Sequence, residues 1–272
     1  MTGTETNALA AAAYYDETNV AKFYRLCWGG SDIHIGRYDT GNETIAEASA
    51  AMTRHLLERS GVGAGDRVLD IACGYGGTLR MLAKLGCHTK GIDISRVCVD
   101  EARRANAEAG LADEIAVDVG DFHAIKDDAE IWDAVICQES LIHSNDRPKV
   151  FSEVYRVLRR GGVFAFSDIL TADGADIAMV EAAFARLGAD AGATPGDYQD
   201  MAIGAGFEIA QAEERLGDIR IHYAKLAELL TKPVEGLDPD AATSIAKNIA
   251  HWQVALADGH ITWACFVARK PT

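Results

Sequence analysis

Residues 68–93 constrain the fold of this chain more than any other stretch. They begin with an apolar run that ends at Asp70, continue through the glycine-rich turn 74–77 and a helical segment, and end with a second apolar run at Asp93. An apolar run, a glycine turn, a helix and another apolar run make a β-α-β unit, whose parallel strands end at one edge of a sheet. The stretch therefore predicts a nucleotide-type pocket at that edge.

The remainder of the chain continues this alternation. Strand patterns occur at residues 66–72, 88–93, 114–119, 132–138, 163–167, 207–212 and 261–269, with helical patterns between most of them. Strands that alternate with helices predict an α/β fold: a doubly wound, mostly parallel, seven-stranded, Rossmann-like sheet. We expect an N-terminal helical cap or lid over residues 1–60, a core over residues 61–272, and inserted helices at about residues 217–257.

Residues 14–38 hold six of the twenty Phe, Trp and Tyr residues of the chain. Such aromatic density ahead of the core indicates a segment that folds over a ligand. The alternative is that each aromatic ring only packs a helix onto the core.

Charge and cysteine content narrow the class of protein. The chain has 272 residues, and Lys+Arg 26 against Asp+Glu 41 gives a net charge of -15. That charge disfavours nucleic acid and anionic membranes as partners, although a high-salt habitat would produce the same balance. The six cysteines lack paired spacing, and no apolar run nears the roughly 20 residues of a membrane span. We expect a cytoplasmic, monomeric or homodimeric enzyme without a metal site.

Carboxylates in the predicted pocket indicate the ligand. Asp70 lies four residues before Gly74, where it would repel a pyrophosphate but could bind an ammonium group, and the G-x-G-x-x-G spacing is absent. Asp93 suits ribose hydroxyls, while Asp121 and Phe122 suit an adenine. Singly, each has an ordinary alternative as a loop acid or a core ring; together they predict S-adenosylmethionine. The expected cofactor-binding residues are Asp70, Gly74, Gly76, Asp93, Ile94, Asp121, Phe122 and Gln138.

A polar segment, residues 138–144, follows the fourth strand and would lie beside the transferred methyl group. Within it, His143 could orient or deprotonate a methyl acceptor, because histidine exchanges protons near neutral pH. The alternative is a histidine that only hydrogen bonds within its own helix.

Several motifs carry a family resemblance. They lie at residues 23–24, 28–30, 33–36, 73–77, 141–147, 222–223, 251–252 and 256–263. Through them the chain resembles the class I S-adenosylmethionine-dependent methyltransferases and, over residues 14–270, the sarcosine/dimethylglycine N-methyltransferase family of betaine synthesis. The phosphoethanolamine methyltransferases are more distantly similar. The resemblance implies a catalytic pair, Tyr24 and His143, and contacts to a small-molecule acceptor from Trp28, Glu139 and Tyr223.

The segment after the fifth strand departs from this family. The family has Thr-Asp-Pro-Met where this chain has residues 167–170, Ser-Asp-Ile-Leu. Arg37, Arg186 and Arg220 are candidate partners for an acceptor carboxylate. Three hypotheses therefore stay open: an N-methyltransferase of sarcosine or dimethylglycine, a natural-product O-, N- or C-methyltransferase, and a non-catalytic module that binds S-adenosylmethionine.

Overall fold

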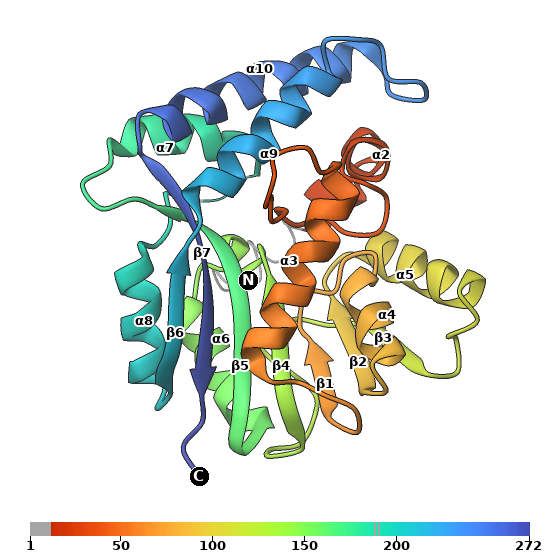
Figure 1. The fold of residues 1–272 in the computed structure, drawn as a ribbon, viewed down its shortest axis with the longest axis vertical. Helices are drawn as coiled ribbons and strands as arrows, with labels where there is room; N and C mark the ends of the chain where they lie inside the picture. The colour runs from red at the N-terminus through yellow and green to blue at the C-terminus, as the bar shows by residue number, and fades with distance from the viewer. Residues whose placement is uncertain (1–11, 188, 190) are drawn as a thin grey trace.

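The computed structural model of the chain describes residues 12–187, 189 and 191–272, apart from the side chain of Arg186. It contains one seven-stranded sheet in the order β3-β2-β1-β4-β5-β7-β6. Neighbouring strands are parallel except at β7, which is antiparallel to β5 and to β6. This arrangement confirms the predicted doubly wound, mostly parallel, Rossmann-like α/β sheet (Figure 1).

The strands lie close to the predicted ranges. They are β1 (Arg67–Asp70), β2 (His88–Asp93), β3 (Ile115–Val119), β4 (Trp132–Gln138), β5 (Leu158–Thr171), β6 (Glu208–Glu214) and β7 (Ile261–Arg269). The helices are α2 (Thr18–Cys27), α3 (Ile45–Ser60), α4 (Gly77–Lys84), α5 (Arg96–Glu108), α6 (Arg147–Val157), α7 (Ile177–Phe184), α8 (Pro195–Gly204), α9 (Leu216–Leu229) and α10 (Pro239–Ala257), with short 3-10 turns η1 (Leu141–His143) and η2 (Ala185–Leu187).

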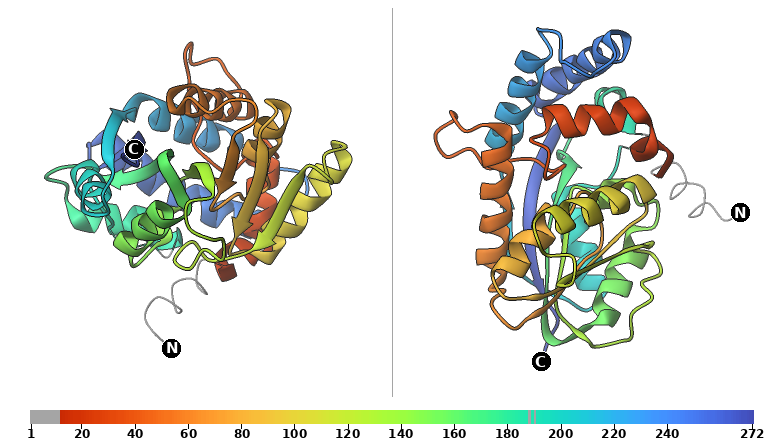
Figure 2. Two further views of the ribbon diagram at one scale, coloured as in Figure 1. Left: turned by 90° about the horizontal axis from the view of Figure 1, so that it is seen from below. Right: turned by 90° about the vertical axis from the view of Figure 1, so that its right-hand side faces the viewer.

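Helices cover both faces of the sheet. On one face α3 packs on β5 and β7, while α4 and α5 pack on β1, β2 and β3; on the other face α6 packs on β5 and α8 on β6. The right-hand view of Figure 2 shows α3 and α6 on opposite sides of the sheet. Helices α2, α7, α9 and α10 lie beyond the end of the sheet where β1 stops (Figure 1). They form a roof over the edge at which the parallel strands end.

Local sequence signals explain where α3 begins and ends. The Thr44 side chain accepts a hydrogen bond from the Glu47 backbone N–H, and the Glu47 carboxylate accepts one from Thr44, so the helix starts at a capping box. Gly61 ends it in the left-handed conformation, at φ 79°. Because α3 packs on the sheet, the predicted division between cap and core at residue 60 stays a prediction.

One predicted boundary is wrong. The strand predicted at residues 163–167 begins earlier, because α6 ends at Val157 and β5 runs from Leu158 to Thr171, through Gly161 and Gly162. The glycines lie in an irregular part of the strand, where the pairing register with β4 shifts between Trp132 and Ala134. Gly161 has φ 73° there, which an L side chain adopts only with strain.

A loop between α2 and α3, here named the lid loop (residues 29–44), is bonded to α9. The backbone N–H of Gly36 donates to His222 Nδ1 at 3.2 Å, and the N–H of Tyr38 donates to Asp218 Oδ1 at 2.7 Å. The phenol of Tyr38 also bonds His222 Nδ1, at 3.0 Å. The N-terminal segment and the C-terminal helices therefore close over the sheet as one connected layer.

Candidate functional site

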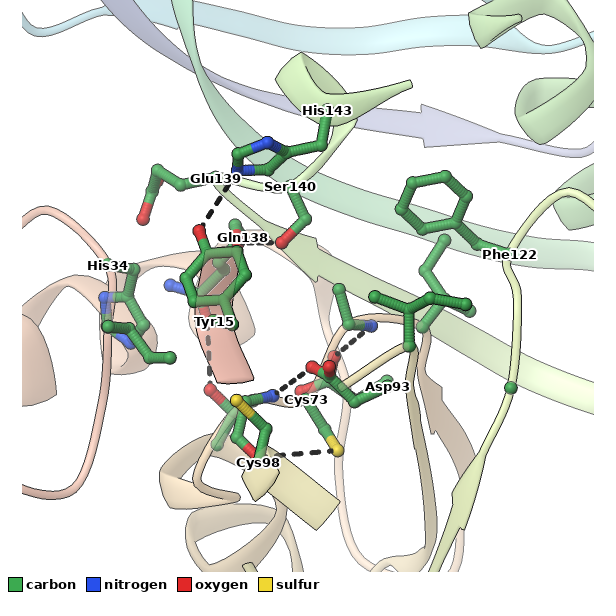
Figure 3. Close-up of a pocket in the computed structure, with 18 of the residues that line it drawn as sticks. Tyr15, His34, Cys73, Asp93, Cys98, Phe122, Gln138, Glu139, Ser140 and His143 are labelled. Carbon is green, nitrogen blue, oxygen red and sulfur yellow. Dashed lines mark hydrogen bonds between the residues drawn. The ribbon is translucent and has the colours of Figure 1, made fainter. Parts of the chain in front are cut away.

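A cavity lies at the carboxyl ends of β1, β2, β3 and β4, under this roof (Figure 3). It contains about 880 Å³ of empty space, which includes the part that is open to solvent. Of the residues predicted from the sequence, it is lined by Asp70, Gly74, Asp93, Ile94, Asp121, Phe122, Gln138, Glu139 and His143. It is also lined by residues that the predicted site did not include, among them Tyr15, Asp32, Ile33, His34, Thr78, His123 and Ser140.

Asp70 and Asp93 form the floor of the cavity. Asp93 Oδ2 accepts the Gly74 backbone N–H at 2.8 Å, and Asp93 Oδ1 accepts the Ser95 N–H at 2.9 Å. Asp70 Oδ1 accepts the Ala72 N–H at 3.2 Å. Burial raises the pKa of Asp70 to about 7 and that of Asp93 to about 6. A cationic ligand would restore full ionisation to both carboxyl groups.

The glycine turn between them has two different tasks. Gly74 has φ 50° and lines the cavity, where a Cβ atom would lie 3.1 Å from the Ile33 side chain of the lid loop. Gly76, the N-cap of α4, has φ 76°, and its Cβ would meet Arg80 and Ala102 instead. Among the described residues, Gly76 shapes the turn and is not part of the cavity wall.

Asp121 belongs to a hydrogen-bonded chain. Its Oδ1 accepts the backbone N–H of His123 and contacts the His123 ring Nδ1 at 2.7 Å, and His123 Nε2 contacts Ser144 Oγ at 2.7 Å. Burial acts to raise the pKa of Asp121, but the hydrogen bonds from His123 outweigh it and the pKa is lowered. Phe122 lies against the same histidine ring, at 4.7 Å between centroids. His123 gave no separate signal in the sequence.

Gln138 has an unsatisfied amide in the cavity wall. Its Oε1 accepts the Thr78 hydroxyl at 3.0 Å and faces the Thr53 hydroxyl at 3.5 Å, while its Nε2 is buried without a partner in the described structure. A buried amide N–H₂ without an acceptor is costly, so this group is available to an acceptor atom of a ligand.

His34 supplies a positive charge beside that amide. Thr53 Oγ1 lies 3.1 Å from His34 Nε2, and Asp32 Oδ1 lies 3.5 Å from the same atom. Burial acts to lower the pKa of His34, but the hydrogen bond and charge of Asp32, with the charge of Glu139, raise it to about 9. His34 is therefore an imidazolium at neutral pH.

Glu139 joins three elements. Its Oε2 accepts the Ile35 backbone N–H of the lid loop at 2.9 Å, and its Oε1 accepts the Ser167 hydroxyl at 2.6 Å and the Trp263 indole N–H at 2.9 Å. The residue has φ 48°, a strained conformation for a side chain larger than glycine. Burial raises its pKa. Glu139 thus lines the predicted site, but its oxygens already bind the protein.

The tyrosine that meets His143 is Tyr15. Its hydroxyl lies 3.0 Å from His143 Nε2, as Figure 3 shows, whereas the hydroxyl of Tyr24 lies 3.2 Å from that of Tyr14. The predicted Tyr24–His143 pairing is therefore not the contact that the described structure shows. The chain breaks helical geometry at Glu17, the N-cap of α2, and the turn before it places Tyr15 in the cavity wall. Tyr24 keeps ring contact with Tyr15, at 5.7 Å.

Both titratable members of this pair stay uncharged. Burial and then the charge of Arg147 lower the pKa of His143 to about 4. Burial, followed by the neighbouring tyrosines, raises the pKa of Tyr15 well above its usual range. A neutral phenol beside a neutral imidazole can pass a proton or orient a lone pair, depending on the ring tautomer.

Trp28 and Tyr223 lie behind the cavity wall rather than in it. The Trp28 indole N–H donates to the His34 carbonyl at 3.0 Å, and its ring packs on His222 at 4.8 Å. The Tyr223 ring stacks on Trp252 at 4.6 Å. Within the part of the chain that the structure describes, both predicted acceptor contacts are packing residues.

Two of the arginines that were candidate partners for an acceptor carboxylate are bound to other protein groups. Arg37 pairs with Asp39 at 2.8 Å, and Arg220 donates to the carbonyls of Leu256 and Ala257 at the end of α10. The Arg186 side chain lies outside the described residues.

One cluster among the described residues has the side-chain types of a metal site: His55, Glu213 and Cys265, with ligand atoms within 4.8 Å of one another. Arg37 Nη1 lies 3.0 Å from His55 Nδ1, so that nitrogen must accept and Nε2 must carry the ring proton toward Glu213. Arg215 also pairs with Glu213, at 2.6 Å. These contacts favour an ion-pair network between the lid loop, α3 and β6.

The charge of the main cavity selects its ligand. Its described lining includes the carboxyl groups of Asp32, Asp70, Asp93, Asp121 and Glu139, and no Lys or Arg. A cavity of this composition at the ends of parallel strands suits a nucleoside with cationic groups, as the sequence predicted. No helix among the described residues is long and apolar enough to span a membrane.

Comparisons with known proteins agree with this geometry. A family model described as a methyltransferase domain matches residues 68–162. The sarcosine/dimethylglycine N-methyltransferase of Aphanothece halophytica is 32% identical over the full length of both chains. A structure described as a sarcosine dimethylglycine methyltransferase from Galdieria sulphuraria is 31% identical, covers 92% of this chain and 97% of its own, and has a TM-score of 0.86. A Haemonchus contortus phosphoethanolamine N-methyltransferase structure, 19% identical, shares the fold over 96% of this chain and 60% of its own with a TM-score of 0.83.

Proposed function

Because this chain belongs to the sarcosine/dimethylglycine N-methyltransferase family of S-adenosylmethionine-dependent methyltransferases, we propose that it methylates a small amine, sarcosine or N,N-dimethylglycine. The observation that carries the acceptor assignment is the length of the similarity: it spans the lid loop and the inserted helices as well as the donor-binding core. The lid loop lines the cavity through Asp32, Ile33 and His34, and α9 is hydrogen bonded to that loop, so acceptor specificity would arise from these segments. The product of dimethylglycine methylation would be betaine.

The residues of the cavity fit the donor. S-adenosylmethionine supplies an electrophilic methyl group on a sulfonium when it is bound. Asp70 would hold its ammonium group and Asp93 its ribose hydroxyls, while Asp121 and Phe122 would bind the adenine. The unpartnered Nε2 of Gln138 would donate to the donor carboxylate. Gly74 and Ile94 would line the same site, and Gly76 would keep the turn in shape.

His34 would complete the recognition of that carboxylate. Its imidazolium and the Gln138 side chain both contact the Thr53 hydroxyl, and both residues line the cavity. A carboxylate between an amide N–H₂ and a positive charge would be satisfied in a cavity that is otherwise acidic.

Tyr15 and His143 would act on the acceptor. An amine must arrive unprotonated, because its lone pair attacks the methyl carbon. With its pKa near 4, His143 remains neutral, so it would orient the amine as a hydrogen-bond partner rather than act as a strong base. Tyr15 would hold the ring and, for a secondary amine such as sarcosine, pass outward the proton that the methylated nitrogen loses; methylated dimethylglycine has no proton on nitrogen to lose. Tyr24 would support Tyr15 through ring contact.

The protein's remaining contribution is alignment and charge. The acidic wall of the cavity, including Glu139, would stabilise a methylated, cationic product. The roof over this end of the sheet would limit the access of water to the reacting atoms. The packing of Trp28 and Tyr223 beneath the roof would set the shape of the acceptor space.

A mass-spectrometric acceptor screen tests the proposal. The protein is incubated with S-adenosylmethionine and glycine, sarcosine, dimethylglycine, phosphoethanolamine, or a panel of phenols and heterocycles. Addition of one methyl group to sarcosine or dimethylglycine is the expected result. Turnover of a phenol or heterocycle without the glycine series would instead support a natural-product methyltransferase, which the altered segment after Asp168 favours. Tight donor binding without transfer to any member of the panel would indicate a binding module.

A further inference from the structure

Arg147 is hydrogen bonded to the backbone of the turn that carries His143, and the proposed function does not use this residue. Arg147 lies in the first turn of α6, and only 8% of it is exposed. Its Nε donates to the Leu141 carbonyl at 3.1 Å and its Nη2 donates to the Ile142 carbonyl at 3.1 Å. One rigid guanidinium thus holds both peptide groups that immediately precede His143.

Two further buried polar residues lie against that guanidinium. Tyr198 of α8 is 1% exposed, and its hydroxyl donates to Asp168 Oδ2 at 2.5 Å. Asp168, at the end of β5, is fully buried and also accepts the Ile169 N–H at 2.9 Å. Arg147 hydrogen bonds Tyr198, and its charge acts on both Tyr198 and Asp168. A buried charge that has such partners is held strongly in place, because withdrawing any partner leaves it unpaired.

Strand β5 also contacts the beginning of the segment at residues 139–143, at Glu139. Ser167 precedes Asp168 on β5, and its hydroxyl donates to Glu139. Successive side chains of a strand point to opposite faces, so Ser167 reaches the cavity side while Asp168 reaches the α6 and α8 side. Residues 139–143 are therefore held from both faces of β5.

We propose that Arg147, backed by Tyr198 and Asp168, is a positioning residue that sets the location of the His143 ring in the active site. The proposal rests on the proposed function, since it takes His143 as the group that meets the acceptor. A displacement of about 1 Å in a catalytic group costs roughly 100-fold in rate, so a clamp on two carbonyls beside His143 acts on turnover without touching the substrate.

Charged and titratable groups face His143 from two other elements. Arg147 faces it from α6, and Tyr15 faces it from the helical turn at residues 12–16. Glu139 and Ser140, which precede it in the same segment, line the cavity with it. The positive charge of Arg147 contributes, after burial, to keeping His143 neutral.

The test uses variants that separate geometry from charge. Arg147→Lys keeps the charge but not the two-carbonyl grip, Arg147→Gln removes the charge, and Tyr198→Phe removes one hydroxyl from a ring that stays packed. Arg156→Lys is the matched control, because Arg156 also lies in α6 and donates to two backbone carbonyls, those of Ile125 and Asp127.

With the acceptor found in the screen, Arg147→Lys is expected to lower kcat by ~10- to 100-fold while the Kd for S-adenosylmethionine, measured by calorimetry, stays within about 2-fold. Tyr198→Phe should show the same pattern to a smaller degree, and Arg156→Lys should match the unmodified protein. Nitrogen-15 NMR of the His143 ring, which needs no turnover, should show its pKa rising from about 4 toward 6.5 in Arg147→Gln but not in Arg147→Lys.

Three results would overturn the proposal. They are a kcat of Arg147→Lys equal to that of Arg156→Lys, a loss of donor affinity as large as the loss of kcat, and an unchanged His143 ring spectrum in Arg147→Gln and Tyr198→Phe. If the unmodified protein methylates no acceptor, the proposed function fails, but the NMR comparison still decides whether Arg147 and Tyr198 control the His143 ring. If an Arg147 variant does not fold, the kinetic measurement and the NMR measurement are both made on Tyr198→Phe, and their results decide the proposal.

Discussion

Replacing Asp70 by asparagine should remove most of the pH dependence of donor binding. The pKa of Asp70 is about 7 in the ligand-free protein, so only ~1% of it is ionised at pH 5, against ~90% at pH 8. A donor that binds the ionised carboxylate would therefore bind ~100-fold more tightly at pH 8 than at pH 5 through this group alone. Asp93, with a pKa of about 6, would add ~10-fold over the same range.

Calorimetry with S-adenosylmethionine from pH 5 to pH 8 measures this dependence. The unmodified protein should gain ~1,000-fold in affinity across the range and release protons on binding, which two buffers of different ionisation enthalpy will reveal. Asp70→Asn keeps the oxygen that accepts the Ala72 N–H, so it should fold normally and retain only the ~10-fold that Asp93 supplies. A flat profile in the unmodified protein, or an equally steep one in the variant, would refute the reasoning, because the donor would then not bind the ionised Asp70.

Three other perturbations follow from single contacts. Glu139→Ala should lower the free energy of unfolding in urea by about 3 kcal/mol or more, because three buried donors lose their acceptor; a loss below ~0.5 kcal/mol would mean that water replaces it. Gly36→Ala would drive a Cβ to 2.4–2.9 Å from α3 and should cost about 1–3 kcal/mol, whereas Gly63→Ala, which meets open space, should cost little; equal stabilities would contradict the packing. Tyr15→Phe should lower kcat by ~10-fold or more with donor affinity unchanged, since it breaks the contact with His143; an unaffected kcat would exclude Tyr15 from catalysis.

Stability should also depend on pH through Asp168. Burial raises its pKa to about 7, above the 3.8 that is its ordinary value, so the folded state holds a proton that the unfolded chain has already lost. The free energy of unfolding from this group therefore decreases as pH rises from about 4 to about 7. Asp168→Asn should flatten that part of a urea-stability profile, and an unchanged slope would show that Asp168 is ionised in the folded protein.

The local sequence pattern was sufficient to predict the strands of the sheet and the carboxylates at the ends of its parallel strands. Apolar runs and helical spacing identified all seven strands, because those signals arise from neighbours within a few residues. Asp70, Asp93 and Asp121 were found because each lies at the end of a parallel strand or within two residues of it, and parallel strands present their carboxyl ends at one edge. The boundary at Gly161 was misplaced because a glycine pair ends a helix as readily as it fits an irregular strand.

The partners of these residues came only from the tertiary structure. Tyr15 meets His143 across 128 positions of sequence, whereas the family resemblance had implied Tyr24 as the partner of that histidine. Glu139 connects the lid loop, β5 and β7, and Arg147 meets Tyr198 and Asp168, through contacts between segments that are distant in the sequence.

The stretch at residues 68–93 by itself determined where the donor pocket lies and that its ligand is cationic, because strand, turn, helix and carboxylates are consecutive in the chain. Which side chains of other segments line that pocket, and which of them are neutral or charged, was decided by the packing of the turn at residues 12–16, the lid loop and residues 138–143 around it. The physical reason is that burial and long-range contacts, which set the pKa of Asp70, His34 and His143, exist only after distant segments have packed together.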